Sequence, residues 1–309
     1  MGALEKFFDS VATIIFVGFL SYFVPDASAH TAAIKPAPVV QATRGLLFEI
    51  KSQKNTAYLF GSIHMAKKDF YPMSPKVESA YTLANTVAIE ADVSDQNAVM
   101  AIMPKLSYVN PDKLENHLSA KTWGEVKAML GSSAEQLQSV KPAVLTSAVV
   151  AQMAMQMGFD PAQGIDLHYI QRAKADKKKL VELESLDFQA NILGGLSDSE
   201  GESLIVSMLD SMKKGEFVGE FNRMVDAWKN ADAASIAKLF TEAGSKDEGS
   251  KKMSKLLLDD RNEGMVAKIN QLMSSGEKLF VVVGAGHLAG EKSIIDLLKK
   301  QGLSVKQIE

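Results

Sequence analysis

The sequence predicts an α/β fold with a central, mostly parallel or mixed sheet and a large helical insertion. Residues 56–62 and 86–92 are apolar, strand-like segments, and residues 74–85 between them have helical spacing. This strand–helix–strand order is typical of a crossover between parallel strands. A further buried strand is expected in "KLFVVVGAGHL", residues 278–288, whereas residues from about 96 to 265 have mainly helical patterns. The sheet is therefore expected to form from segments at both ends of the chain.

The first two predicted strands form a β-hairpin. "GLLFEIKSQ" (45–53) and "TAYLFGS" (56–62) flank Lys54-Asn55, which predicts a two-residue turn. In the helix that follows, Ser74 is the expected cap and Pro75 occupies the first turn. This part of the chain should therefore be compact and local.

The middle of the chain is predicted to be a helical insertion interrupted by one short strand. Four helical segments precede residue 176, and the strand is expected in "KKLVELES", residues 178–185. Further helical segments follow from residue 197. Most of the 15 methionines fall in this region, where filling the core is their expected use. Residues 291–302 and 303–309 then predict a last helix and a last strand.

The N-terminal segment has the features of a secretory signal. Lys6 precedes an uncharged apolar run at 11–24, and Ala27-Ser28-Ala29 supplies a small-x-small cleavage pattern. The run is short for a membrane span, although a retained anchor is the alternative interpretation. The predicted organisation is a signal peptide at 1–29, a flexible leader at 30–44, and one domain at 45–309, with the helical insertion at about 96–265.

Composition limits the class of protein. The 309 residues are 46% hydrophobic and 23% charged, which is ordinary for a globular domain. The absence of cysteine excludes disulfides, thiol nucleophiles, thiolate metal sites and a lipoprotein anchor. A net charge of −3 does not suit a nucleic-acid partner. We therefore expect no nucleic acid and, after signal cleavage, no membrane among the partners.

Polar side chains follow the predicted strands at their carboxyl ends. In open α/β sheets such residues gather in a crevice outside those ends, so residues distant in sequence can share one site. A site that combines two histidines with carboxylates is therefore expected there. The residues concerned are His64, Glu90, Asp92, Glu182, Glu184 and His287.

Both strand-end histidines follow a glycine by three positions, at Gly61 and Gly284. Glycine permits a sharp turn that swings the following side chain over the sheet. Imidazoles with carboxylates fit a divalent metal such as zinc, manganese or cobalt, or metal-free acid–base chemistry. No Gly-x-Ser-x-Gly elbow is present, and Ser62 is the one serine worth testing. Residue types alone leave open that the histidines are structural.

Four segments resemble, in order, the blocks of the TraB/GumN family, which also contains the animal Tiki proteins. They are residues 58–92, 158–189, 256–269 and 279–305, and the paired Gly-x-x-His motifs are the most specific part. The resemblance implies a single α/β domain with a helical insertion, related to erythromycin esterases and heme-binding ChaN-like proteins. Tiki members are proteases that depend on manganese or cobalt. Many relatives have threonine where this chain has Ser62.

The resemblance also implies roles for particular residues. The motif histidines correspond to His64 and His287, the strand-end acid to Glu90, and the Arg-Asn pair of the family to Arg261 and Asn262. The first three are expected to bind an ion or its activated water, and Arg261 to hold a carboxylate or stabilise developing negative charge. Supporting roles are expected for Asp92, Asp166, Glu184 and Asn262.

The resulting hypothesis is an exported, metal-dependent hydrolase, most simply a peptidase that acts on a peptide or protein substrate in the periplasm of a Gram-negative bacterium. The expected cofactor is a divalent metal such as Mn, Co or Zn. The alternative is a non-catalytic periplasmic binding protein for heme or a peptide, which would use the same crevice without turnover.

Overall fold

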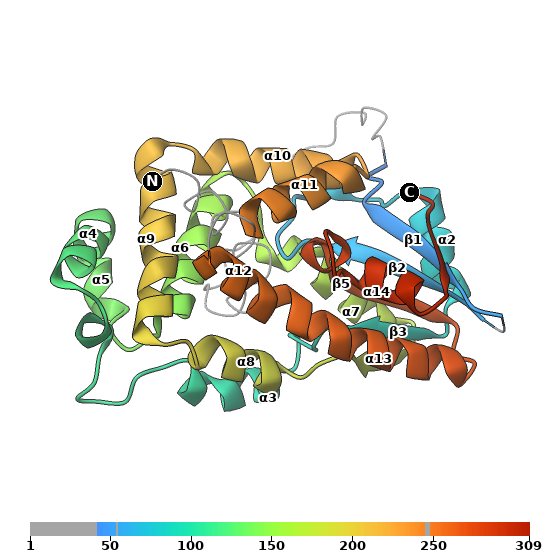
Figure 1. Cartoon of the computed structure of the whole chain (residues 1–309), viewed down its shortest axis with the longest axis horizontal. Helices are drawn as coiled ribbons and strands as arrows, with labels where there is room; N and C mark the ends of the chain where they lie inside the picture. The colour runs from blue at the N-terminus through green and yellow to red at the C-terminus, as the bar shows by residue number, and fades with distance from the viewer. Residues whose placement is uncertain (1–41, 54, 245–247) are drawn as a thin grey trace, which may run out of the picture.

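The protein is an α/β fold around one six-stranded mixed sheet, as the sequence predicts (Figure 1). The computed structural model describes residues 42–53, 55–244 and 248–309, so the predicted signal peptide at 1–29 lies outside the described residues. Of the predicted leader, Thr43 is described, and it is buried and bridges Met73. The strands are β1 (Leu46–Lys51), β2 (Thr56–Ser62), β3 (Thr86–Ile89), β4 (Lys179–Glu182), β5 (Leu279–Gly284) and β6 (Ser304–Gln307).

The strands lie in the order β4-β3-β5-β2-β1-β6. The first four of these run parallel, and β1 is antiparallel to both β2 and β6. The carboxyl ends of β2, β3, β4 and β5 therefore meet at one edge of the sheet. The hairpin differs from the prediction: pairing stops at Lys51 opposite Thr56, so four residues, 52–55, connect the strands.

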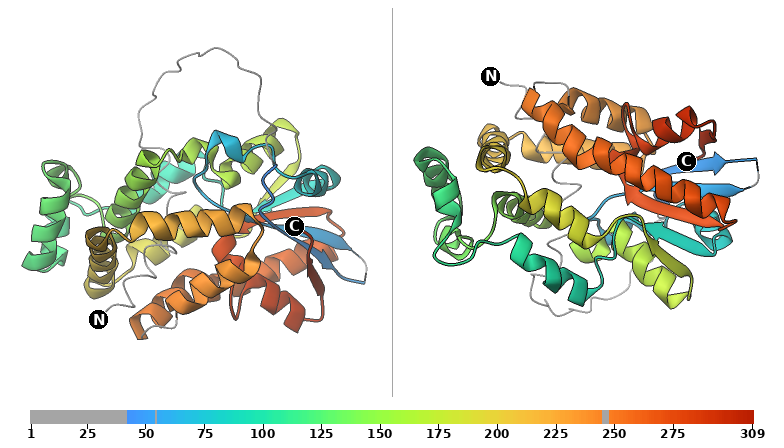
Figure 2. Two further views of the ribbon diagram at one scale, coloured as in Figure 1. Left: turned by 90° about the horizontal axis from the view of Figure 1, so that it is seen from above. Right: turned by 60° about the horizontal axis from the view of Figure 1, so that its bottom comes forward.

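Helices cover both faces of the sheet. Helices α2 (Pro75–Leu83) and α7 (Ile165–Ala175) lie on one face, and α13 (Asp260–Ser274) and α14 (Ile294–Lys300) lie on the other (Figure 2). The rings of Tyr81 on α2 and Tyr169 on α7 both pack against Phe280 of β5, with centroids 5.7 and 4.9 Å away. These contacts cover Phe280 on the face of α2 and α7, and α13 packs against β5 from the opposite face. Burial on both faces explains why β5 is a continuous apolar run.

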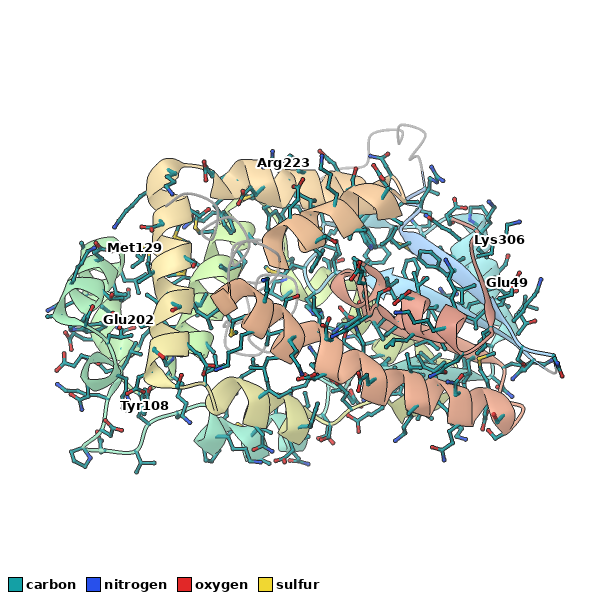
Figure 3. All side chains as sticks on the ribbon, in the orientation of Figure 1. Glu49, Tyr108, Met129, Glu202, Arg223 and Lys306 are labelled. Atoms are coloured by element: carbon teal, nitrogen blue, oxygen red, sulfur yellow. The ribbon has the colours of Figure 1, made fainter. Side chains whose placement is uncertain are left out.

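The other helices extend beyond the sheet, and Met129 of α4 lies at the end of the molecule farthest from Lys306 of β6 (Figure 3). Within the predicted insertion at about 96–265, α7 packs against β3, β4 and β5. The helices other than α2, α7, α13 and α14 are α3 (Gln96–Ile102), α4 (Ala120–Leu130), α5 (Ser133–Gln136), α6 (Pro142–Gln156), α8 (Leu186–Gly194), α9 (Asp198–Lys214), α10 (Phe217–Lys229), α11 (Ala233–Gly244) and α12 (Glu248–Ser254). None of the helices in the described part of the chain meets the length and hydropathy that a membrane span requires.

Local sequence signals explain the element boundaries near the site. Ser74 accepts a hydrogen bond from the Val77 amide and Pro75 begins α2, as predicted. Before α13, residues Lys255–Asp259 form a π-helical turn. Such turns are rare and frequently occur at functional sites. Here Asp260 alone separates the turn from Arg261 and Asn262.

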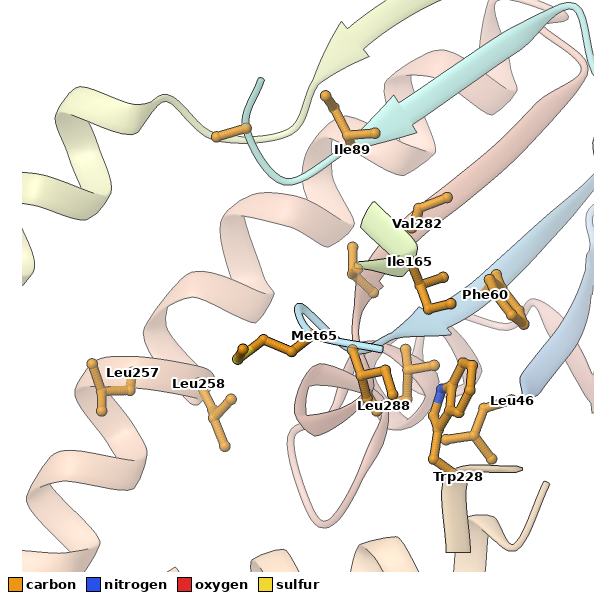
Figure 4. Close-up of a cluster of buried hydrophobic side chains, with 14 of the residues drawn as sticks. Leu46, Phe60, Met65, Ile89, Ile165, Trp228, Leu257, Leu258, Val282 and Leu288 are labelled. Atoms are coloured by element: carbon orange, nitrogen blue, oxygen red, sulfur yellow. The ribbon is translucent and has the colours of Figure 1, made fainter. Parts of the chain in front are cut away.

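An aromatic cluster supports the end of β2. Phe60 lies against Trp228 of α10 with ring centroids 6.3 Å apart, and both side chains are fully buried (Figure 4). The Trp228 indole N–H donates to the carbonyl oxygen of Gly61 at 2.7 Å. The bond satisfies a buried acceptor at the start of the first Gly-x-x-His motif, so the core fixes the backbone from which His64 projects.

Candidate functional site

The first motif histidine is held between the end of β2 and the start of α7. The backbone amide of Ile165, the first residue of α7, donates to the Ile63 carbonyl at 2.9 Å. On the next residue of the helix, Asp166 accepts from His64 Nδ1 at 2.7 Å and from the hydroxyl of Ser62. Because Nδ1 donates to this carboxylate, Nε2 is the ring nitrogen of His64 that this contact leaves available for another partner.

The second motif histidine has a matching arrangement with an amide. His287 lies in the short 3₁₀ turn Ala285–Leu288 after β5 and is fully buried. Its Nδ1 donates to the side-chain oxygen of Asn262 at 2.7 Å, while the amide nitrogen of Asn262 donates to the Lys292 carbonyl at 3.0 Å. The Nε2 atom of His287 is buried and has no hydrogen-bond partner within the described residues. Buried polar atoms are rarely left so, which makes this nitrogen a candidate ligand or base.

Glu90, directly after β3, lies between the two motifs. Its Oε1 accepts from the Gly284 backbone amide at 2.6 Å and lies 3.6 Å from His287 Nε2. A Cβ atom on Gly284 would stand 3.2 Å from Glu90 Oε1, 3.7 Å from His287 Cδ2 and 3.9 Å from His64 Nε2. Both imidazoles and the carboxylate therefore surround this glycine, and the missing side chain leaves the space in which they converge.

A buried guanidinium fixes the other side of Glu90. Arg261, with 3% of its surface exposed, donates through Nη2 to Glu90 Oε2 at 2.6 Å and to Glu184 Oε2 at 2.8 Å. Its Nε contacts both oxygens of Glu184, and its Nη1 donates to the carbonyl of Leu257 in the π-helical turn. Charge-assisted contacts of this kind are the strong ones in a protein interior. The guanidinium thus joins the carboxylates that follow β3 and β4.

Burial and neighbouring charges set the protonation states. Burial lowers the pKa of His287 to about 3, so this imidazole is neutral at pH 7. Burial alone would raise the pKa of Glu90, but the nearby Arg261 and His64 charges and the hydrogen bond from the Gly284 amide lower it to about 2. For His64, burial also opposes charge, but the Asp166 carboxylate outweighs it and raises the pKa. The site combines an ionised carboxylate with a neutral imidazole whose Nε2 carries a lone pair.

The sequence matches a family model over most of its length. The model is that of the TraB/PrgY/gumN family, and it covers residues 46–307. The chain belongs to this family. Among similar proteins, the uncharacterized protein YbaP of Shigella flexneri is 25% identical over 251 residues, which is 79% of this chain and 88% of that protein. YbaP of Escherichia coli (strain K12) is 25% identical over 250 residues, or 78% and 87%. An uncharacterized protein of Treponema pallidum (strain Nichols) is 19% identical over 271 residues, or 84% and 81%. No solved structure matches the chain.

The structure of this TraB/PrgY/gumN chain brings together seven of the residues singled out from the sequence. They lie on or after four strands and two helices and form three hydrogen-bonded groups that converge near Gly284 and are together called the network: His64 with Asp166, His287 with Asn262, and Glu90 with Arg261 and Glu184. The seven residues are His64, Glu90, Asp166, Glu184, Arg261, Asn262 and His287.

Asp92 lies apart from this network. Its carboxylate contacts Lys174 at 2.7 Å and accepts from Ser94. Although Asp92 is only two positions after Glu90, β3 has already ended at Ile89, so the alternation of a strand does not carry both acids to the same side. None of these contacts of Asp92 reaches the residues of the network, which its expected supporting role would require. Glu182 accepts from the Asp92 backbone amide and also lies outside the network.

Sequence reasoning missed one side chain of the network. Gln189 of α8 donates to Glu184 Oε2 at 3.1 Å and is 3.4 Å from Glu90 Oε2. It also missed that the Gly284 amide is a hydrogen-bond donor to Glu90. The one sequence feature that could have indicated Gln189 is its position, five residues after the strand-end acid Glu184.

The fit of a metal ion to these residues is partial. Among residues 42–53, 55–244 and 248–309 no three histidine or acidic side chains form a ready ligand group. Both oxygens of Glu90 are occupied by donors. However, each imidazole is oriented through Nδ1 by an oxygen acceptor, which is the usual arrangement behind a metal-binding Nε2, and His287 Nε2 is unpartnered. The donor types and the orphaned nitrogen therefore fit a divalent ion.

Acid should destabilise the protein through His287. Because its pKa is about 3 in the fold against 6.5 in a free chain, the unfolded state binds a proton first as the pH falls below 6.5. Stability present above pH 6.5 is then lost by up to about 1.4 kcal/mol per pH unit. Glu90, lowered from 4.5 to about 2, adds to this loss only below pH 4.5.

Urea unfolding at pH 4.5 to 7 would measure this slope, with His287→Gln as the comparison because glutamine does not titrate. His64, whose pKa is raised, contributes in the opposite sense, because its stabilisation grows as the pH falls toward 6.5, but it is present in both proteins and cancels in the comparison. Equal slopes for the two proteins would contradict a neutral, buried His287.

Gly164 should be required for the position of His64. A Cβ atom on Gly164 would stand 2.3 Å from the backbone oxygen of His64, a contact that only a backbone shift can relieve. We expect Gly164→Ala to lower the free energy of unfolding by about 1–3 kcal/mol. Gly124 is the control, because it lies inside α4 with open space around it, and its change to alanine should stabilise by about 0.5–1 kcal/mol. Urea titration of both variants measures the difference, and equal stabilities would contradict the close approach.

Proposed function

We propose that this TraB/PrgY/gumN protein is an exported, metal-dependent hydrolase, and specifically a peptidase. The observation that carries the proposal is the pairing of His64 with Asp166 and of His287 with Asn262, each through Nδ1. This pairing leaves two Nε2 atoms beside the same ionised carboxylate, Glu90. Structural histidines rarely share such an arrangement, because a buried nitrogen without a partner costs stability.

His64, His287 and Glu90 are the residues that would hold the ion, with Mn, Co or Zn as the proposed metals. A bound divalent ion supplies a water of lowered pKa and polarises a carbonyl group. The residues of the chain itself contribute orientation and charge. Asp166 and Asn262 fix the tautomers of the imidazoles, and the Gly284 amide with Arg261 keeps Glu90 ionised.

We assign Arg261 to holding Glu90 rather than to binding substrate. Its Nε, Nη1 and Nη2 all have partners within the protein, and its side chain is 3% exposed. A substrate carboxylate would have to displace Glu90 or Glu184 from a buried charge pair, which is costly. The expected role for Arg261 in stabilising negative charge at the substrate is therefore replaced by a positioning role.

The proposed substrates are peptides or proteins, and the proposed location is the periplasm of a Gram-negative bacterium. The apolar run and the cleavage pattern in residues 1–29 support export. The peptide substrate is an analogy to the Tiki members of the family, and the paired motif histidines are the part of the chain that carries it. No nucleic-acid partner is proposed.

Metal analysis followed by digestion of a peptide library tests the proposal. Protein purified without chelators should contain a sub-stoichiometric or full complement of Mn, Co or Zn. It should cleave library peptides when one of these ions is present and stop when EDTA is added. Parallel titrations with heme and with uncleaved peptides test the alternative. Firm binding without cleavage under any of the three metals would replace the hydrolase with a binding protein.

A further inference from the structure

Gln189 makes contacts that the proposed reaction does not yet use. Its side-chain nitrogen lies 3.1 Å from Glu184 Oε2 and 3.4 Å from Glu90 Oε2. Nη2 of Arg261 donates to the same two oxygen atoms, at 2.8 and 2.6 Å. Two donors on different helices, α8 and α13, therefore bridge one pair of carboxylate oxygens.

This arrangement answers a physical difficulty of the site. The side chains of Glu90 and Glu184 are largely buried, with 11% and 5% exposed, and two like charges so placed repel each other. Arg261 supplies one positive charge for the two. A neutral amide that donates to both oxygens adds a second attachment without changing the charge of the site.

We infer that Gln189 is a positioning residue that fixes the orientation of the Glu90 carboxylate through its Oε2 atom. With Oε2 held by Gln189 and Arg261, Oε1 stays at the Gly284 amide, 2.6 Å away, and toward Nε2 of His287, 3.6 Å away. The expected effect of Gln189 on metal affinity rests on the proposed function, whereas its effect on the orientation of the Glu90 carboxylate is independent of that function.

The position of α8 itself does not depend on this contact. Ser185 caps the helix by accepting from the Phe188 amide, and Leu186, Ala190 and Leu193 are buried. Changing Gln189 to methionine, which has similar length and no donor, should therefore leave the fold intact. Gly284 of β5 donates its amide to Glu90. A change in the Gly284 amide in the variant would therefore report a movement of Glu90.

The test uses two measurements on Gln189→Met in the full chain. In protein labelled with ¹⁵N-glycine, the Gly284 amide proton should resonate downfield in the wild type because it donates to a carboxylate. It should move upfield in the variant. The dissociation constant for Co²⁺, followed by its visible absorption, should rise about 10- to 100-fold, the usual cost of losing an outer contact of a metal site. Gln152→Met, at an exposed position on α6, is the matched control and should change neither quantity.

The outcomes separate this inference from the proposed function. An unchanged Gly284 signal in a folded variant overturns the positioning role, whatever the metal does. A shifted signal with a weaker Co²⁺ affinity supports both. If the wild type binds none of Co²⁺, Mn²⁺ and Zn²⁺, the metal-dependent hydrolase fails, while a shifted Gly284 signal still supports the role of Gln189. A variant with a lower melting temperature and an unchanged Gly284 signal assigns Gln189 to stability alone.

Discussion

Replacing His287 with alanine is expected to lower metal-dependent hydrolysis by at least about 100-fold, because the variant lacks one of the three side chains that would hold the ion, and losing even an outer contact of a metal site costs about 10- to 100-fold. The physical reason is that its Nε2 is a buried lone pair 3.6 Å from Glu90 Oε1, and alanine has no nitrogen to take its place. His64→Ala should cause a comparable loss, because its Nε2 faces the same space beside Gly284. Both variants should also lose affinity for Co²⁺.

Initial rates on a cleaved library peptide, with metal content measured on the same samples, check this expectation. His117→Asn is the control histidine, since His117 lies between Asp112 and Asp198, outside the network. That variant should retain wild-type activity. Circular dichroism must show that each variant is folded. Full activity in both His64→Ala and His287→Ala would remove these residues from the mechanism.

Removing the cation of the site should be the most destabilising change. Arg261→Met leaves the Glu90 and Glu184 carboxylates buried without their shared partner, and breaking a buried pair in this way typically costs about 3–5 kcal/mol. Most of this cost comes from the carboxylate that is left without a cation. Adding Glu184→Gln to Arg261→Met should therefore restore part of the lost stability. Coupling of this kind is expected for residues in direct contact.

Urea unfolding of the two single variants and the double variant measures the coupling. Arg223→Met provides the surface control (Figure 3): Arg223 is 66% exposed and 3.8 Å from Glu220, so its loss should cost less than about 1 kcal/mol. If Arg261→Met were as stable as Arg223→Met, the buried charge pair would not stabilise this fold. Additive single effects would mean that Arg261 and Glu184 do not act as a unit.

The agreement between sequence and structure is closest where the interactions are local. The cap at Ser74, the apolar run of β5 and the strand-end position of Glu90 depend on neighbours within a few residues, so their signals lie in short segments. The prediction of a two-residue hairpin turn was wrong, because the length of the turn depends on where strand pairing stops. Lys51 and Thr56 still pair, and four residues remain outside the ladder.

The sequence by itself determined the α/β class, the carboxyl-end location of the polar residues and the two Gly-x-x-His motifs, because backbone geometry and burial impose their own periodicities. Only the tertiary structure decided which nitrogen of each histidine is free and what Arg261 contacts. Arg261 lies 171 residues from Glu90 and 77 from Glu184 in sequence. Contacts between such distant residues arise from the parallel strand order and the placement of α7, α8 and α13, which no local pattern contains.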